Sequence, residues 1–266
     1  MKGLRFLALL LMLLSPLIAA KAQAAASECL AMAQAPASFQ RARFLSSALE
    51  ANQVQFTFVG HSTFLIESPG GVRIATDYSG YANGIIPDVV TMNHAHRSHY
   101  TDFPDPAIKR VLRGWNPAGG PARHDLTVGD VRIRNVTTDI RGGAMGRIAD
   151  GNSIFIFEIA GLCIGHLGHL HHELSPEQLG AIGRLDIVLV PVDGTYTMAQ
   201  ASMQNVLKEL KARIVLPMHY FGPETLARFV KGLSGSLDIE YSKGPSIVLS
   251  AAQLPEKPRL IVLPGY

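Results

Sequence analysis

The sequence predicts an α+β protein in which helices cover β-sheets. From residue 53 the first half of the chain consists of short apolar runs separated by glycine and proline, a pattern typical of strands joined by turns. The second half alternates strand-like runs with segments of helical periodicity. Several strand-like runs are apolar on both faces, as expected for sheets that are covered by helices.

The first half supplies strands and turns in close succession. Gly60, the run Pro69-Gly70-Gly71 and Gly80 mark turns between them. The runs with strand character are residues 54–59, 63–67, 72–76, 89–92 and 111–112. A loop rich in glycine and proline follows at 114–121. Strands are then expected at 130–138, 153–159 and 162–165, the last two joined as a hairpin around Ala160-Gly161.

The second half begins with a helix start. Ser175-Pro176-Glu177-Gln178 forms a capping box with proline at the first helical position. A helix over 198–211 is predicted because Met203, Val206, Leu207 and Leu210 repeat at helical spacing. Another helix is expected at 223–231. Strands are expected at 187–192, 213–217, 239–241, 246–249 and 260–263.

The N-terminus has the composition of a secretory signal peptide. Lys2 and Arg5 precede an apolar run at 6–20, and an alanine-rich stretch follows at 22–26. A membrane anchor is the alternative, but the run is shorter than the roughly 20 residues that span a bilayer, and Pro16 interrupts it. We therefore expect residues 1–26 to be cleaved and the protein to be exported, to the periplasm or the extracellular space. Residues 27–52 are expected to form an N-terminal arm and residues 53–266 one domain.

Charge and cysteine content limit the partners. The chain has 24 basic and 21 acidic residues, and residues 1–26 hold three of the bases and no acid, so the mature chain is formally neutral. This removes the electrostatic basis for binding nucleic acid or an anionic membrane, and favours a small-molecule substrate. Oligomeric state is not indicated. Cys29 and Cys163 are the two cysteines, and export permits a disulfide between them, although a buried free Cys163 is an equal alternative.

Seven of the ten histidines fall in two short windows, each after a predicted strand. They are His94, His96 and His99 in the first window, and His166, His169, His171 and His172 in the second. Imidazoles at the spacing of the first window can converge on one metal ion in an extended turn. Three imidazoles and a water make a competent catalytic zinc site, although imidazole also suits copper, iron and nickel.

The segment 91–100, TMNHAHRSHY, resembles the His-x-His-x-Asp-His signature of the metallo-β-lactamase superfamily. Further segments occur in the order found in its branch related to ascorbate-phosphate lactonase: 60–67 (GHSTFLIE), 74–77 (IATD), 166–172 (HLGHLHH), 190–194 (VPVDG) and 216–220 (LPMHY). The resemblance covers residues 54–222. It implies a four-layered αβ/βα sandwich of two mixed β-sheets flanked by helices, with the site at one edge of the packed sheets.

The chain departs from the family motif at three places. Ser98 stands where the family has an aspartate that binds the second metal, and His169 stands where it has the aspartate that bridges two metals. The segment 136–143 lacks the expected third histidine, and Asp139 is its nearest substitute. Losing two carboxylates removes negative charge that would hold two dications together. We therefore expect no more than one divalent metal per chain, with zinc preferred.

The expected metal ligands are the imidazoles that the motifs retain: His94, His96, His99, His169 and His219. The nitrogens of His96, His99, His169 and His219 are predicted to converge on one point. Asp77, Ser98 and Asp193 are expected around them, Asp77 to fix an imidazole and Asp193 to supply a carboxylate near the metal. His61 is equally compatible with a structural hydrogen bond and with ligation.

The resemblance implies a metal-dependent hydrolase in which a metal-bound hydroxide attacks an ester, lactone, amide or phosphoester. The departures at Ser98 and at 136–143 leave a non-catalytic, metal- or ligand-binding descendant as the alternative. A true β-lactamase ranks below both, because the ligand pattern is further from those enzymes and fold alone does not imply function.

Overall fold

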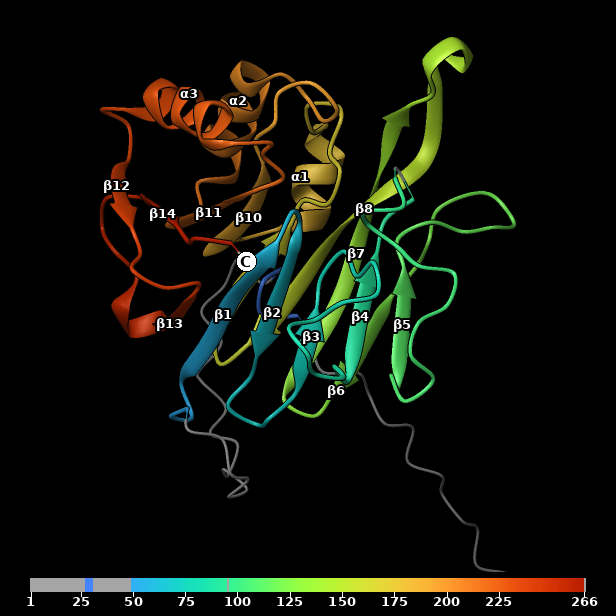
Figure 1. The fold of residues 1–266 in the computed structure, drawn as a ribbon, viewed down its shortest axis with the longest axis horizontal. Helices are drawn as coiled ribbons and strands as arrows, with labels where there is room; N and C mark the ends of the chain where they lie inside the picture. Colours follow the sequence, from blue (N-terminus) through green and yellow to red (C-terminus); the bar gives the residue numbers. More distant parts are fainter. Residues whose placement is uncertain (1–26, 31–48, 95, 266) are drawn as a thin grey trace, which may run out of the picture.

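The computed structural model describes residues 27–30, 49–94 and 96–265 (Figure 1). The predicted signal peptide lies outside these residues, as does most of the predicted arm, residues 31–48. Within the described part of the chain, no helix has the length and apolar character needed to cross a bilayer.

One sheet has six strands in the order β13-β1-β2-β3-β4-β5. The pairs β13–β1, β1–β2 and β2–β3 are antiparallel, whereas the pairs β3–β4 and β4–β5 are parallel. The strands are β1 (Gln53–Gly60), β2 (Thr63–Glu67), β3 (Arg73–Ala75), β4 (Val89–Met92), β5 (Arg110–Arg113) and β13 (Ser246–Ser250). The sequence predicted each of these strands but not that β13, near the end of the chain, pairs with β1.

The other sheet has eight strands in the order β12-β14-β11-β10-β9-β8-β7-β6. β6 to β9 are antiparallel, and β9, β10, β11, β14 and β12 are parallel. The strands are β6 (Asp125–Val128), β7 (Val131–Arg141), β8 (Arg147–Ile159), β9 (Leu162–His166), β10 (Ile187–Pro191), β11 (Ile214–Met218), β12 (Asp238–Tyr241) and β14 (Arg259–Val262). β7 and β8 are longer than predicted and meet at a short 3₁₀ turn, Gly143–Met145. Edge strand β6 was missed because its exposed Asp125 and Thr127 alternate with only two apolar residues, so it contains no apolar run.

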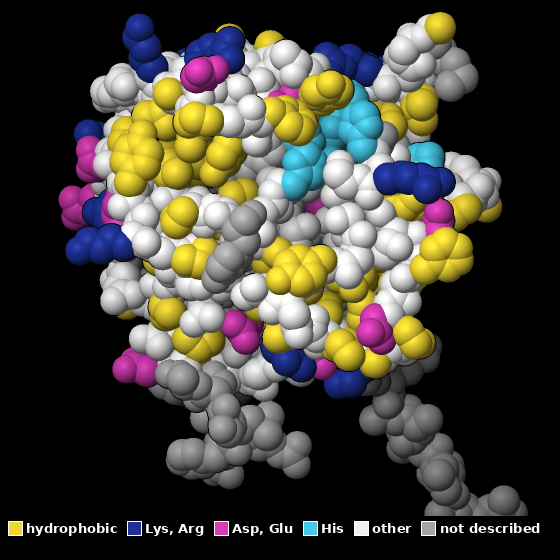
Figure 2. Space-filling view, in the orientation of Figure 1, with side chains coloured by type: hydrophobic (Ala, Val, Ile, Leu, Met, Phe, Trp, Pro, Cys, Tyr) yellow, Lys and Arg dark blue, Asp and Glu magenta, His cyan; other side chains and the backbone are white. Residues whose placement is uncertain are grey.

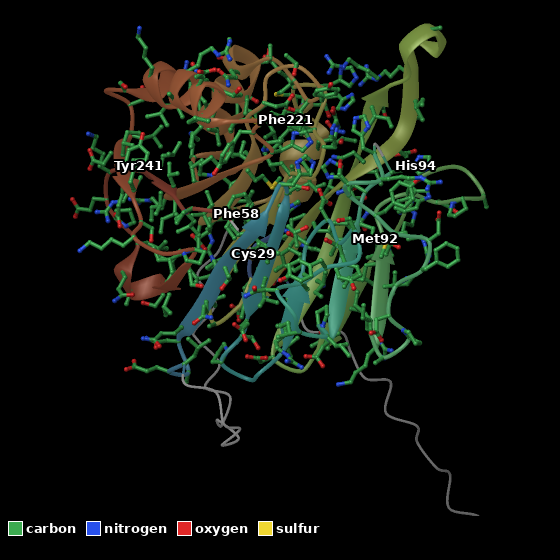
Figure 3. The ribbon with its side chains drawn as sticks, viewed as in Figure 1. Cys29, Phe58, Met92, His94, Phe221 and Tyr241 are labelled. Atoms are coloured by element: carbon green, nitrogen blue, oxygen red, sulfur yellow. A yellow bond between two sulfur atoms is a disulfide. The ribbon has the colours of Figure 1, made fainter. Side chains whose placement is uncertain are left out.

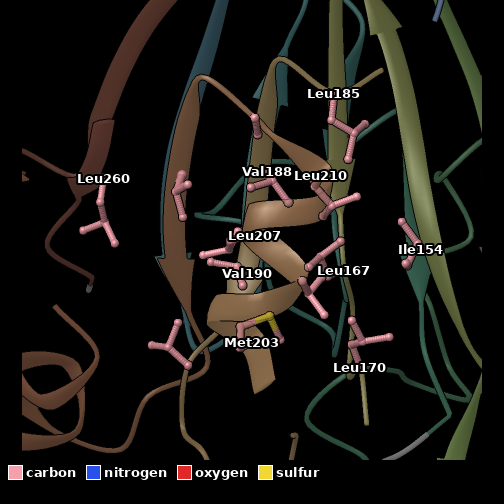
Figure 4. Close-up of a cluster of buried hydrophobic side chains, with 14 of the residues drawn as sticks. Ile154, Leu167, Leu170, Leu185, Val188, Val190, Met203, Leu207, Leu210 and Leu260 are labelled. Carbon is pink, nitrogen blue, oxygen red and sulfur yellow. The ribbon is translucent and has the colours of Figure 1, made fainter. Parts of the chain in front are cut away.

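Three helices pack on the outer face of the eight-stranded sheet. They are α1 (Pro176–Ile182), α2 (Gln200–Leu210) and α3 (Pro223–Leu233). The predicted capping box is present, since Ser175 and Gln178 exchange side-chain and backbone hydrogen bonds at the start of α1. The predicted apolar stripe of α2 is buried, and Figure 4 shows Met203, Leu207 and Leu210 facing Val188 and Val190 of β10.

A second apolar core lies between the two sheets. Phe56 and Phe64 of the six-stranded sheet belong to the same buried cluster as Phe155 and Phe157 of β8. The predicted α+β class with two mixed sheets is confirmed by this architecture. One difference is that, in the described residues, loops rather than helices cover the outer face of the six-stranded sheet, where Tyr78 and Ile108 pack on Met92. The connections 76–88 and 96–109 contain glycine or proline at several positions, which disfavours helix.

Cys29 and Cys163 form a disulfide. The bond joins residues 27–30 to β9, and the same short segment donates two hydrogen bonds to Glu158, from Ser27 Oγ at 2.5 Å and from the Glu28 amide at 3.0 Å. The alternative of a free Cys163 is therefore wrong in this structure.

Candidate metal centre

The polar residues of the candidate site come from one edge of both sheets. Asp77 and His99 follow the carboxyl ends of the parallel strands β3 and β4, and His219 follows the parallel strand β11. His61 lies in the turn between β1 and β2. Because parallel strands end at the same edge, segments far apart in the sequence meet there.

His99 is held by a carboxylate of its own sheet. Its Nδ1 lies 2.7 Å from Asp77 Oδ2, and both side chains are fully buried. The other oxygen of Asp77 accepts a hydrogen bond from Asn93 Nδ2 at 2.8 Å. Burial alone would raise the pKa of Asp77, but His166, His99 and the hydrogen bonds from His99 and Asn93 hold this pKa below its usual value. Asp77 is therefore ionised and accepts from His99 Nδ1, so the lone pair of a neutral His99 ring lies on Nε2.

His219 is held in the same way by the other sheet. Its Nδ1 lies 3.1 Å from Asp193 Oδ1, in the loop after β10. Burial would raise the pKa of Asp193, but hydrogen bonds from His219, from the Thr197 hydroxyl and from the Thr195 amide hold it well below its usual value. Asp193 thus accepts from His219 Nδ1, and His219 Nε2 is left without a proton. Asp77 fixes an imidazole, as the sequence suggested. Asp193 does the same for His219, and its expected role as a carboxylate near the metal stays a prediction.

The two unprotonated nitrogens face each other. His99 Nε2 and His219 Nε2 are 3.1 Å apart. Two lone pairs at this separation require a shared proton or a shared cation between them. A zinc ion binds imidazole nitrogen at about 2.0–2.1 Å, so one ion reaches both atoms. The pair therefore fits a metal ion, and the two carboxylates are partners of the kind that orient metal-binding histidines.

His61 completes the tightest group. One nitrogen each from His61, His99 and His219 lie within 4.8 Å of one another. The His61 ring packs 4.2 Å from that of His219 by centroid distance, and its carbonyl accepts the His219 amide at 2.6 Å. Burial, together with the neighbouring His219 and His99, lowers the pKa of His61 to about 4, so the ring is neutral near pH 7. The sequence left the role of His61 open, because its direction depends on a positive φ of 50° in the turn.

His169 joins the cluster from the second window. Its ring centroid lies 4.8 Å from those of both His99 and His219. Its Nδ1 is 2.5 Å from His171 Nε2, and its Nε2 is buried with no hydrogen-bond partner among the described residues. Burial first, and then the neighbouring histidines, lower the pKa of His169.

His166, at the end of β9, is fully buried and has two hydrogen bonds. Its Nε2 donates to the Ser62 carbonyl at 2.9 Å, and its Nδ1 accepts the Gly168 amide at 3.1 Å. Both ring nitrogens are thus used in hydrogen bonds within the fold.

His96 lies at the exposed side of the cluster. Its ring is 4.9 Å from His169, 6.3 Å from His99 and 5.8 Å from Tyr196. The rings of His99, His169 and His219 meet as predicted, with centroids 4.8–5.0 Å apart, whereas His96 lies outside the tightest group. The convergence of the His96 nitrogens with theirs, and the role of all four rings as ligands, stay predictions. Two exposed aromatic side chains, Tyr196 and Phe221, lie 5.4 Å apart beside the cluster. Figure 2 shows the cyan histidines opening on this face next to yellow hydrophobic side chains.

His94 does not join the cluster. Its exposed ring packs 5.0 Å from Trp115 and 5.8 Å from Tyr100, and Figure 3 shows it well to the side of Phe221. The cause is the alternation of side chains along an extended chain. Asn93 points between the sheets, where it binds Asp77 and Ser153, so His94 points to the opposite side with Met92. The prediction of His94 as a ligand is therefore corrected.

Two further sequence expectations have clear outcomes. Ser98 Oγ lies 3.1 Å from His61 Nε2, so a hydroxyl occupies the place expected for a carboxylate. Asp139 is paired with Arg147 at 2.6 Å on the β7–β8 hairpin, and does not replace the missing histidine. The pairing of His171 with His169 was missed, since spacing alone does not show which ring nitrogen faces a neighbour.

The residues of the site lie in a part of the chain that matches a known protein family. The beta-lactamase superfamily domain matches residues 55–219. Among curated proteins, a metal-dependent hydrolase of Methanoregula boonei is 24% identical over 200 residues, covering 70% of this chain and 90% of that protein. One of Archaeoglobus fulgidus is 25% identical over 223 residues, covering 70% and 94%.

Solved structures share the architecture. A protein of Thermotoga maritima, named as a zinc-dependent hydrolase of the metallo-beta-lactamase superfamily, aligns with a TM-score of 0.57 and 29% identity, covering 79% of this chain and 98% of that one. A metallo hydrolase of Ignicoccus hospitalis aligns with a TM-score of 0.53 and 21% identity, covering 74% and 99%. The second likeness concerns the fold alone.

Proposed function

Because this chain belongs to the beta-lactamase superfamily, we propose that it is a metal-dependent hydrolase that binds one divalent ion, preferably zinc, at His61, His99 and His219. The observation that carries the proposal is the 3.1 Å approach of His99 Nε2 and His219 Nε2, which are the lone-pair nitrogens of neutral rings whose Nδ1 atoms face carboxylates. The names of the similar proteins, hydrolases described as metal- or zinc-dependent, agree with it.

The carboxylates near the three imidazoles bear on how many metal ions one chain binds. Within the part of the chain that the structure describes, the carboxylates hydrogen-bonded to His99 and His219 are Asp77 and Asp193, and each also accepts from another donor. No carboxylate therefore remains beside the three imidazoles, among the described residues, to hold a second dication. We propose one metal per chain.

When bound, a divalent ion at this place supplies Lewis acidity and lowers the pKa of a water that it coordinates. The side chains of the protein orient the imidazoles and contact the substrate. Asp77 and Asp193 hold the tautomer and the orientation in which the Nε2 lone pairs of neutral His99 and His219 face one point. The exposed rings of Tyr196 and Phe221 offer an apolar surface beside that point for the non-reacting part of a small substrate. We propose that the bond cleaved is an ester, lactone, amide or phosphoester. The lactone is included because the sequence motifs resemble the branch related to ascorbate-phosphate lactonase.

The test is metal analysis followed by turnover. Purified protein, dialysed against a weak chelator, is expected to hold one equivalent of zinc. The zinc-loaded protein should hydrolyse at least one of a panel of chromogenic esters, lactones, anilides and phosphoesters, and lose that activity on chelation. One equivalent of zinc without turnover on any member would instead support the non-catalytic alternative, which the hydroxyl at Ser98 motivates.

We also propose that the protein is exported. The disulfide between Cys29 and Cys163 supports this, because such bonds persist in oxidising compartments. Protein expressed in its own host is expected in the periplasm or the medium, with residues 1–26 absent and no free thiol by mass spectrometry. Intact Met1 in the mature protein, or two free thiols, would contradict export.

A further inference from the structure

Three buried rings lie around one point but are bound by different partners. His99, His169 and His219 are 4.8–5.0 Å apart by ring centroid. His99 and His219 each donate from Nδ1 to a carboxylate. His169 has no carboxylate on Nδ1; it has a second imidazole, His171.

The direction of the His171 contact follows from the backbone. The Arg141 amide can only donate, and it does so to His171 Nδ1 at 2.7 Å. His171 Nδ1 is therefore a lone pair, and the single proton of a neutral ring lies on Nε2. That Nε2 faces His169 Nδ1 at 2.5 Å, so His171 donates and His169 Nδ1 accepts. The proton of a neutral His169 then lies on Nε2.

A charged form of the pair does not fit these contacts. An imidazolium at His171 would place a proton on Nδ1 against the Arg141 amide. An imidazolium at His169 would place its Nδ1 proton against the Nε2 proton of His171. Burial, and then the neighbouring Arg141, also lower the pKa of His171 to about 4.

The backbone fixes where the resulting N–H points. The His169 amide donates to Asn152 Oδ1 at 2.7 Å, and the preceding Gly168 has φ +59°. A Cβ at Gly168 would lie 2.4 Å from both Asn152 Oδ1 and Asn93 Nδ2, so no larger residue fits. The main chain at His169 is thus fixed, its ring is held at Nδ1 by His171, and its buried Nε2 has no partner among the described residues. A buried donor without an acceptor costs free energy, which an acceptor on a bound molecule recovers.

We propose that His169 is not a metal ligand but a hydrogen-bond donor, and that its Nε2–H binds an oxygen of the substrate on which negative charge develops. The inference rests on the proposed function and refines it. The carbonyl or phosphoryl oxygen of a bound substrate would lie between the ion that His99 and His219 would hold and this donor. The family has a carboxylate at this position, which accepts hydrogen bonds and binds metal. Here the same position carries His169, which donates a hydrogen bond.

The first test reads the tautomers directly and needs no substrate. Long-range ¹H–¹⁵N spectra of the protein, with and without zinc, are assigned by single substitutions of each ring. We expect His169 to be protonated on Nε2 in both states, and His99 and His219 to be protonated on Nδ1. A His169 ring that is protonated on Nδ1, or whose Nε2 signal moves on zinc binding as the His219 signal does, would overturn the inference.

The second test separates metal binding from turnover. His169→Ala is expected to keep one equivalent of zinc, while kcat on the panel substrate falls by about 10²–10³, as for removal of one oxyanion donor. His169→Gln, whose amide can donate, should recover part of kcat, and the exposed His94→Ala is the matched histidine control with unchanged zinc and kcat. Loss of zinc from both His169 variants would show that this ring is a ligand. Absence of turnover in the wild type would defeat the proposed function while leaving the tautomer result to decide the role of His169.

Discussion

The two sheets contribute histidines that are equally buried but bound in different ways. His99 from the six-stranded sheet and His219 from the eight-stranded sheet each face a carboxylate, whereas His169, also from the eight-stranded sheet, faces His171. The partner on one ring nitrogen decides what the other can do. A carboxylate leaves a lone pair for a metal, and a donating imidazole leaves an N–H. A histidine-rich site can therefore contain ligands and donors that spacing in the sequence does not distinguish.

The largest effect is expected from removing a carboxylate-held ring. His219→Ala should lower zinc affinity by more than the roughly 10–100-fold that loss of a supporting partner costs, because a ligand itself is lost. His96→Ala should have less effect, since His96 is exposed and outside the tightest group. Competition with a chromophoric chelator measures both. Equal losses in the two variants would make His96 a ligand and place it with His99 and His219.

The next effect concerns the carboxylates. Asp77→Asn and Asp193→Asn keep the size of the side chain but no longer require their histidine to donate, so each should weaken zinc binding about 10–100-fold. His171→Phe, the corresponding change behind His169, should leave zinc affinity unchanged. Isothermal titration of the three variants compares them directly. A similar loss in His171→Phe would erase the difference between the two kinds of ring.

A pH effect on stability is expected in the metal-free protein. His61 and His171 have pKa values lowered by burial to about 4, against 6.5 without that environment. Below pH 6.5 the unfolded chain therefore binds protons that the folded protein excludes. The contribution of these two neutral rings to the free energy of unfolding should be complete above pH 6.5, and it should decrease progressively as the pH falls to about 4. Urea unfolding at several pH values measures it, and the double variant His61→Asn/His171→Asn should show a shallower fall; an unchanged slope would contradict the assignment.

The smallest effect is expected at Arg141. Its Nη2 donates to the carbonyls of Thr195, Tyr196 and Thr197 at 2.7 Å, which ties β7 to the loop that follows Asp193. Arg141→Ala removes these contacts but keeps the amide that binds His171. Because Arg141 is exposed, we expect a change in unfolding free energy below about 1 kcal/mol, with unchanged zinc content and faster amide exchange at 195–197. Protection equal to the wild type would show that the loop is held by Asp193 alone.

Local patterns predicted most of the fold. The stripe of Met203 to Leu210 and the capping box at Ser175 are complete within a few residues, so periodicity and turn chemistry suffice to find them. The pairing of β13 with β1 involves Ser250 and Gln53, far apart in the chain, and nothing local encodes it. The same limit applies to the Cys29–Cys163 disulfide, whose alternatives the sequence left open.

The sequence predicted where the site lies but not the role of each of its histidines. The two histidine windows and the motif order located the edge where His99, His169 and His219 meet. The error at His94 arose because all three histidines of one loop were assumed to point to the same side. Asn93, between β4 and His94, points inward, so its neighbour His94 points outward. The roles of His61 and His169 depend on a turn dihedral and on hydrogen bonds to other segments, which one sequence does not contain.

His166 has a consequence for how relatives of this protein are compared. Its ring joins the Ser62 carbonyl of one sheet to the end of β9 in the other, and it has no nitrogen left for chemistry. A relative that has lost every reactive group would still gain these two contacts from a histidine at this position. Retention of a histidine at this position in a lineage is therefore a record of architecture, and gives no information on whether the lineage still catalyses a reaction.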